Sequence, residues 1–120
     1  MKHVSGRGIS EASRRSSERQ EAVDASIRGL EREGWRVLPA AGVQGIPGNS
    51  GPRLIAGNCT HAFRVLVVLP EEIDSPGTRA QISNSAKRGE TRVFVAWPTR
   101  WRMISNLERW GIPGVAVNVW

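Results

Sequence analysis

The chain has 120 residues and a mass of 13.2 kDa, which fits one domain with a single hydrophobic core. Its net charge is +6, which excludes a predominantly acidic protein. Lys2 and Lys87 are the only lysines, so almost all of the positive charge comes from arginine, and arginine favours a phosphate-rich partner. A single cysteine excludes an internal disulfide, and no apolar stretch has the length of a membrane span, so we expect a soluble cytoplasmic protein.

The N-terminal region is predicted to hold a basic arm and then a helix. Residues 1–16 are rich in Ser, Gly and basic side chains and are expected to form a flexible arm, followed by one domain at residues 17–120. The helix is expected to begin near Ser17, with the glutamine three residues later completing a capping box. An upstream extension of this helix through Arg14 and Arg15 stays open.

Apolar residues at helical spacing and apolar runs between Gly and Pro predict the other elements. Gly34 is expected to end the first helix as a left-handed cap. In the run 62–69 Phe63 and Val65 are expected on one face of a strand, and Arg64 and Leu66 on the other. The expected strands cover residues 35–38, 53–57, 62–69, 91–97 and 115–120, and the two later helices cover residues 78–88 and 100–110. The order α-β-β-β-α-β-α-β predicts an α/β fold, a mixed central β-sheet flanked by helices.

Several local sequences in this order carry a resemblance to a known family. They are GWRVLPAAG, PRLIAGN, AFRVLVV and GETRVFVAW. A charged helix precedes the first of them, and a helix with Gln81 lies between the last two. From about Ser17 to Trp97 the chain resembles the archaeal-type Holliday junction resolvases and the wider PD-(D/E)XK nuclease superfamily. The resemblance implies a restriction-endonuclease-like fold and a homodimer.

The residues that should perform nuclease chemistry are replaced. The resemblance aligns Pro52 with the proline of the family motif, Arg53 with its aspartate, Arg64 with its glutamate and Leu66 with its lysine. Only Glu18 matches an acidic position of the family, on the first helix. Arginine has no lone pair available to hold Mg²⁺ and stays protonated, whereas it binds phosphate well. The pattern therefore favours a protein that has lost catalysis and binds the nucleic-acid backbone.

We therefore predict a non-catalytic protein that binds duplex or branched DNA, with no catalytic residue, metal or cofactor. The predicted nucleic-acid-binding residues are Arg53, Arg64, Arg14, Arg15, Lys87 and Arg88. One alternative is an active metal-dependent nuclease whose site has migrated to Glu18 with Glu71 or Glu72. Another is a protein-interaction inhibitor encoded by a mobile element, which the basic charge disfavours because inhibitors of DNA-binding enzymes are often acidic.

The remaining candidates are interpreted as structural. Cys59 lies beside an apolar strand and is expected to be a buried, inert thiol. In the run Trp97–Arg102 aromatic and basic residues alternate, a pattern that can stack unpaired bases and hold phosphates. We interpret Trp97 and Trp101 as core residues instead, with the neighbouring arginines in solvent.

Overall fold

The computed structural model describes residues 2–39 and 54–120, with side chains from residue 14 onward except Pro39. The elements in chain order are α1 (Lys2–Arg32), β1 (Arg36–Pro39), β2 (Leu54–Gly57), β3 (Ala62–Val68), η1 (Pro70–Glu72), α2 (Pro76–Arg88), β4 (Thr91–Val95), η2 (Trp97–Thr99), α3 (Arg100–Trp110) and β5 (Val115–Val119). The predicted order of helices and strands is confirmed. No helix in these described ranges has both the length and the apolar character needed to cross a membrane.

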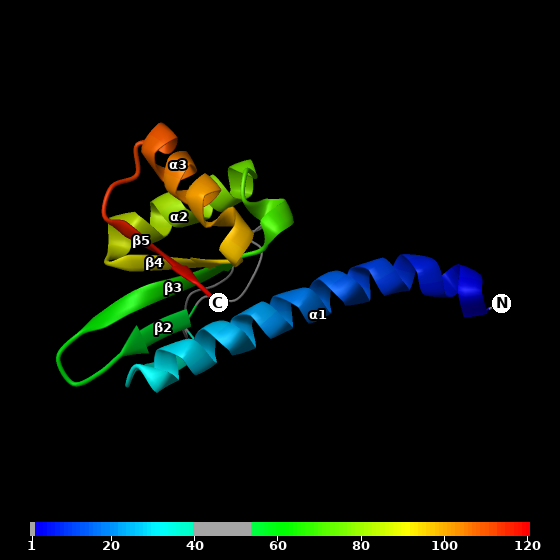
Figure 1. Cartoon of the computed structure of the whole chain (residues 1–120), viewed down its shortest axis with the longest axis horizontal. Coiled ribbons are helices and arrows are strands. Elements are labelled where there is room, and N and C mark those ends of the chain that lie inside the picture. The colour runs from blue at the N-terminus through cyan, green and yellow to red at the C-terminus, as the bar shows by residue number, and fades with distance from the viewer. Residues whose placement is uncertain (1, 40–53) are drawn as a thin grey trace.

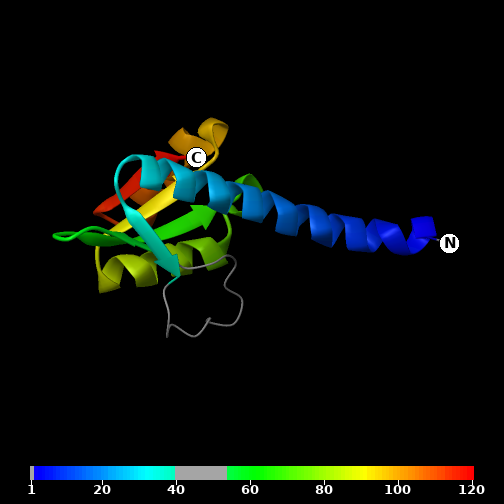
Figure 2. The same ribbon diagram turned by 90° about the horizontal axis from the view of Figure 1, so that it is seen from below.

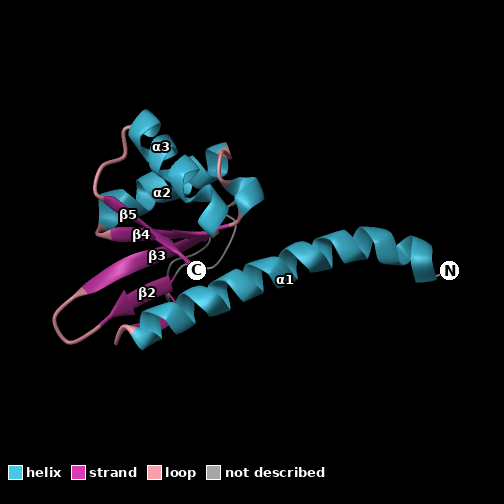
Figure 3. Ribbon diagram, in the orientation of Figure 1, coloured by secondary structure: helices cyan, strands magenta, loops and turns pink. Residues whose placement is uncertain are grey.

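The five strands form one mixed sheet in the order β1-β2-β3-β4-β5 (Figures 1 and 3). β1, β2 and β3 pair antiparallel, and β3, β4 and β5 pair parallel. The short turn between β2 and β3 is closed by Asn58, whose side-chain oxygen accepts hydrogen bonds from the backbone N–H groups of Thr60 and His61, both at 2.9 Å. Each parallel pair is instead joined through a helix, because a parallel connection must cross from one end of the sheet to the other. The predicted mixed α/β sheet is confirmed.

Helices cover both faces of the sheet and enclose two cores (Figures 1 and 2). α1 packs on one face, where Leu30, Phe63 and Val65 are buried. α2 and α3 pack on the other face, against Leu66 and Val93. The expected alternation along β3 is confirmed, because its odd-numbered residues from 63 to 67 face α1, and Leu66 and Val68 face α2 and α3.

The predicted start of the first helix is wrong. α1 begins at Lys2, so residues expected to form a flexible arm belong to a 31-residue helix. The capping box at Ser17 does not form, since the Gln20 side chain donates a hydrogen bond to Asp24 Oδ1 at 2.9 Å. No proline interrupts residues 2–32, so the i to i−4 hydrogen bonds can continue through Ser17. The first half of α1 extends beyond the edge of the sheet (Figures 1 and 2).

Other boundaries move for local reasons. α2 begins at Pro76 instead of Thr78, because the Ser75 hydroxyl accepts a hydrogen bond from the Gly77 N–H at 3.1 Å and Pro76 suits the first helical position. β4 ends at Val95, before the chain turns into η2. The expected burial of Cys59 is wrong, since this residue lies exposed in the turn after β2.

Two glycines, one at the end of a helix and one inside a helix, allow a test of backbone conformation. Gly111 ends α3 with a φ of 68°, in the left-handed region, whereas Gly29 lies inside α1 with open space around the position of a Cβ atom. Gly111→Ala should therefore lower the free energy of unfolding by about 1–2 kcal/mol. Gly29→Ala should raise it by roughly 0.5–1 kcal/mol, because alanine loses less backbone entropy in a helix.

Urea unfolding of both variants measures these changes. A Gly111→Ala protein as stable as wild type would show that the left-handed end of α3 carries no strain for alanine.

Candidate nucleic-acid interface

The positions that the resemblance marks as catalytic have very different surroundings. Leu66 is only 4% exposed and belongs to the core under α2 and α3. Arg64 lies on the same face of β3, near its beginning, and is partly exposed. Pro52 and Arg53 lie outside the described residues. Leu66, at the place of the expected lysine, is thus a core residue. Arg64, at the place of the expected glutamate, is partly exposed and borders a surface recess.

Arg64 is held in place by a chain of hydrogen bonds. Its Nε donates to the Ser85 hydroxyl oxygen of α2 at 3.0 Å. Ser85 lies 2.8 Å from the Thr91 hydroxyl oxygen, and Thr91 in turn donates to the Gly89 carbonyl oxygen at 3.1 Å. A hydroxyl group has one hydrogen to donate, and Thr91 uses its own in the bond to Gly89. Ser85 must therefore donate to Thr91 while it accepts from Arg64. The chain ties β3, α2 and the start of β4 together, and it orients the guanidinium group.

Arg64 and Arg88 share one small recess between β3 and α2. The recess is lined by Leu54, Arg64, Val65, Leu66, Gln81, Asn84, Ser85 and Arg88, with no carboxylate among these residues. The free space inside is about 10 Å³, roughly the room that one water molecule needs. A phosphate group is too large to enter, so it could meet only the rim, where Arg88 is exposed.

The other predicted binding residues do not join this recess. Lys87, on the same turn of α2 as Arg88, lines a different groove with Gly111 and Pro113. Arg14 and Arg15 are exposed on α1, the helix that packs on the opposite face of the sheet. The six predicted residues therefore do not form one cleft, since the structure brings together Arg64 and Arg88 and leaves Lys87, Arg14 and Arg15 apart, while Arg53 is not described.

Two carboxylates of the alternative nuclease site, Glu72 and Glu18, have protein partners. The Glu72 side chain forms an ion pair with Arg19 and accepts a hydrogen bond from the Leu69 N–H at 3.2 Å. Glu18 pairs with Arg14 one helical turn earlier, at 4.0 Å. Within residues 14–38 and 54–120, no three or more His, Cys, Asp or Glu side chains gather closely enough to hold a metal ion. The described carboxylates thus give the migrated site no geometric support.

The interpretation of the two tryptophans as core residues is wrong. Trp97 is 64% exposed and Trp101 is 68% exposed. α3 instead buries Met103 and Leu107 and half-buries Trp110, so its inward face is turned away from Trp101. The sequence did contain this signal, because Met103, Leu107 and Trp110 recur at spacings of four and three residues, a stripe that excludes Trp101.

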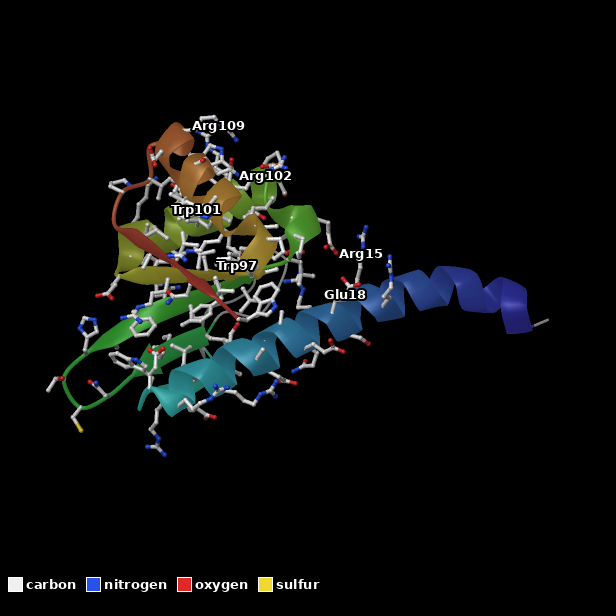
Figure 4. All side chains as sticks on the ribbon, viewed as in Figure 1. Arg15, Glu18, Trp97, Trp101, Arg102 and Arg109 are labelled. Atoms are coloured by element: carbon white, nitrogen blue, oxygen red, sulfur yellow. The ribbon has the colours of Figure 1, made fainter. Side chains whose placement is uncertain are left out.

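The exposed tryptophans lie at the carboxyl end of the parallel strands. β3 runs into η1 and β4 runs into η2, which carries Trp97 and leads directly into α3 with Trp101. Figure 4 shows Trp97 beside this end of the sheet, with Trp101 and Arg102 farther along α3. The carboxyl ends of the strands are where open α/β sheets most often bind their ligands. We call Trp97, Arg100, Trp101 and Arg102 the Trp–Arg surface.

A polar network fixes the orientation of this surface. Asp74, which precedes α2, accepts hydrogen bonds from Asn106 Nδ2 at 2.8 Å and Arg102 Nε at 3.2 Å, and it also pairs with the Arg102 Nη2 group. Asn106 is buried and also donates to the Ile73 carbonyl oxygen at 3.1 Å. The hydrogen bond from Asn106, followed by that from Arg102, lowers the pKa of the Asp74 carboxyl below its usual value. α3 is thereby fastened to the loop before α2.

Arginines accompany the tryptophan rings. The Arg100 guanidinium carbon lies 5.4 Å from the centre of the Trp101 ring, within the range of a cation–π contact. Arg102 remains 63% exposed at its side chain although it pairs with Asp74. Arg109, near the other end of α3, donates to Asn106 Oδ1 at 2.7 Å. α3 therefore presents aromatic faces together with positive charge.

Comparisons with protein-family models, with curated proteins and with solved structures found no match to this chain.

The pKa of Asp74 leads to a prediction about pH. Because hydrogen bonds lower the pKa in the folded state, the carboxylate contributes stability that is present above its unfolded pKa of about 3.9 and is lost as the pH falls through the folded value. Asp74→Asn should therefore melt at a lower temperature than wild type at pH 7, and the difference should shrink below about pH 4.

Thermal melts from pH 7 to pH 2 measure this difference. Glu108→Gln removes a charge from an exposed position of α3 and serves as the control, with a melting curve close to wild type at pH 7. A difference for Asp74→Asn that stays constant at every pH would contradict the assigned network.

Proposed function

We propose that this protein binds nucleic acid without cleaving it, on a nuclease-like α/β domain. The observation that carries the proposal is the recess between β3 and α2, where the resemblance expects a catalytic glutamate. Arg64 and Arg88 line it, and none of its described lining residues is a carboxylate. The mixed sheet with helices on both faces is compatible with the fold that the resemblance implies.

The chemistry of such a recess suits phosphate and not a divalent cation. Hydrolysis in this nuclease family needs carboxylates that hold a metal, which then polarises the phosphate and activates water. Two guanidinium groups repel a metal ion and attract the phosphate itself. With a net charge of +6, the protein also gains from the release of counterions when it approaches a phosphate backbone.

The size of the recess limits what Arg64 can do. Because a phosphate cannot enter, Arg88 at the rim is the direct ligand in this proposal, and Arg64 supplies charge from behind it. This arrangement recognises the backbone of a duplex or a branched junction without reading its sequence. The homodimer implied by the resemblance would place two such recesses on one DNA and stays a prediction.

The first consequence concerns cleavage. Purified protein incubated with duplex or four-way junction DNA and Mg²⁺ or Mn²⁺ should leave the DNA intact, because the matched carboxylate positions do not hold metal ligands. Metal-dependent cleavage that disappears in Glu18→Ala or Glu71→Ala would overturn the proposal and establish the migrated nuclease site.

The second consequence concerns salt. Affinity for a DNA duplex or junction should fall linearly with salt on logarithmic axes, with a slope of about 0.9 per phosphate contact. Arg64→Gln combined with Arg88→Gln should lower that slope by about 1, because Arg88 is the one of the two that meets a phosphate directly. Mobility-shift titrations at several salt concentrations give the slope.

Two matched pairs separate the recess from diffuse charge. Arg14→Gln with Arg15→Gln removes the same charge from the extended part of α1, and Arg28→Gln with Arg32→Gln removes it from the part packed on the sheet. Equal losses for all three pairs would mean that only net charge matters. A larger loss for the Arg14 and Arg15 pair would move the binding site to α1. Arg88→Gln alone keeps the comparison valid if the Arg64 substitution impairs folding.

A further inference from the structure

We infer that the Trp–Arg surface binds unpaired bases of single-stranded nucleic acid, as a site separate from the recess between β3 and α2. The inference rests on the proposed function and names the part of the nucleic acid that this second site takes up. Trp97 and Trp101 supply the stacking faces, and Arg100 and Arg102 supply charge for the phosphates beside those bases.

The exposure of the two rings is the first observation. A tryptophan side chain is mostly buried in folded proteins, because its large apolar surface is costly to leave in water. Here two of them, 64% and 68% exposed, lie four residues apart in sequence, Trp97 on η2 and Trp101 on α3. Leu38 and Ile55, the other large exposed apolar residues of the described chain, lie on β1 and β2 instead. Two aromatic rings are therefore open to solvent on the neighbouring elements η2 and α3.

The part of the surface on α3, with Trp101, is also held in place for a ligand. Arg100 lies over the Trp101 ring, and Arg102 is fastened to Asp74, which the buried Asn106 also holds. α3 can therefore rotate little relative to the loop before α2. A base that stacks on such a ring does not have to order a loop first, which lowers the entropy cost of binding.

Charge identifies the occupant. Exposed tryptophans occur at protein interfaces as well as on stacking platforms for bases. On α3 the charged residues are three arginines and one glutamate, in a protein whose net charge is +6. This positive charge suits a nucleic-acid strand, which carries one negatively charged phosphate for each base. Bases inside a duplex are already stacked on each other, so only unpaired bases offer a face to these rings.

Binding of a fluorescent single-stranded thymidine oligomer, measured by anisotropy, tests the inference. Trp97→Leu and Trp101→Leu should each weaken binding at least about five-fold, since stacking on one ring contributes at least that factor. Trp97→Phe and Trp101→Phe keep an aromatic face and should recover most of the affinity. Binding to a fully paired duplex should change less than two-fold in all four variants.

Controls separate a stacking site from a general loss of apolar surface. Leu38→Ala removes an exposed apolar side chain from β1 and should leave binding of the oligomer unchanged. If Trp→Leu variants bind the single strand as wild type does, or lose duplex and single-strand binding equally, the inference is wrong.

The two proposals fail in different ways. Duplex binding without any single-strand binding would remove the stacking site and leave the proposed function standing. If neither duplex nor single strand binds at low salt, the proposed function fails as well, and the exposed tryptophans are assigned to a protein partner. Thermal melts of each variant establish that the protein compared is folded.

Discussion

The structure depends on β3 being buried on both of its faces. Val65 and Val67 pack under α1, while Leu66 and Val68 pack under α2 and α3, so this one strand contributes to both cores. Its pairing is antiparallel with β2 and parallel with β4. Because side chains alternate, a slip of one residue would exchange the two sets and turn Arg64 into the core below α1. Burying an unpaired guanidinium is costly, so the position of Arg64 helps to specify the register.

The same alternation places Arg64 next to α2. Its hydrogen bond to Ser85 and the further link to Thr91 make it part of the packing between sheet and helix. A side chain so constrained keeps its direction, but it leaves almost no room around it. In the proposed function, the positive charge at the place of the expected glutamate acts on a phosphate mainly through the electrostatic field and through Arg88. Such binding depends strongly on salt and discriminates little between sequences.

Two further surfaces follow from how the helices meet the sheet. Among the side chains of α1 that the structure describes, Ala22 and Val23 are the first buried ones, and Arg19 forms an ion pair with Glu72 of η1. The described turns before these contacts carry Arg14 and Arg15, both exposed, on the part of α1 that extends beyond the sheet (Figure 4 labels Arg15). On the other face Asp74 and Asn106 hold α3 so that Met103 and Leu107 face the core. These contacts separate the basic residues into several surfaces.

The sequence by itself determined the order of the elements, the mixed sheet, the alternation along β3 and the left-handed glycine at the end of the first helix. These features depend on local periods and on single glycines and prolines, which act over a few residues. Tertiary structure decided the exposure of Cys59 and the distribution of the predicted binding residues. It also decided that Trp101 lies outside. The spacing on α3 allowed an inward stripe of Trp101, Ile104 and Leu107 as well as one of Met103, Leu107 and Trp110, and packing against the sheet selects the second. A residue's period gives the faces of an element, but the neighbouring elements determine which face is buried.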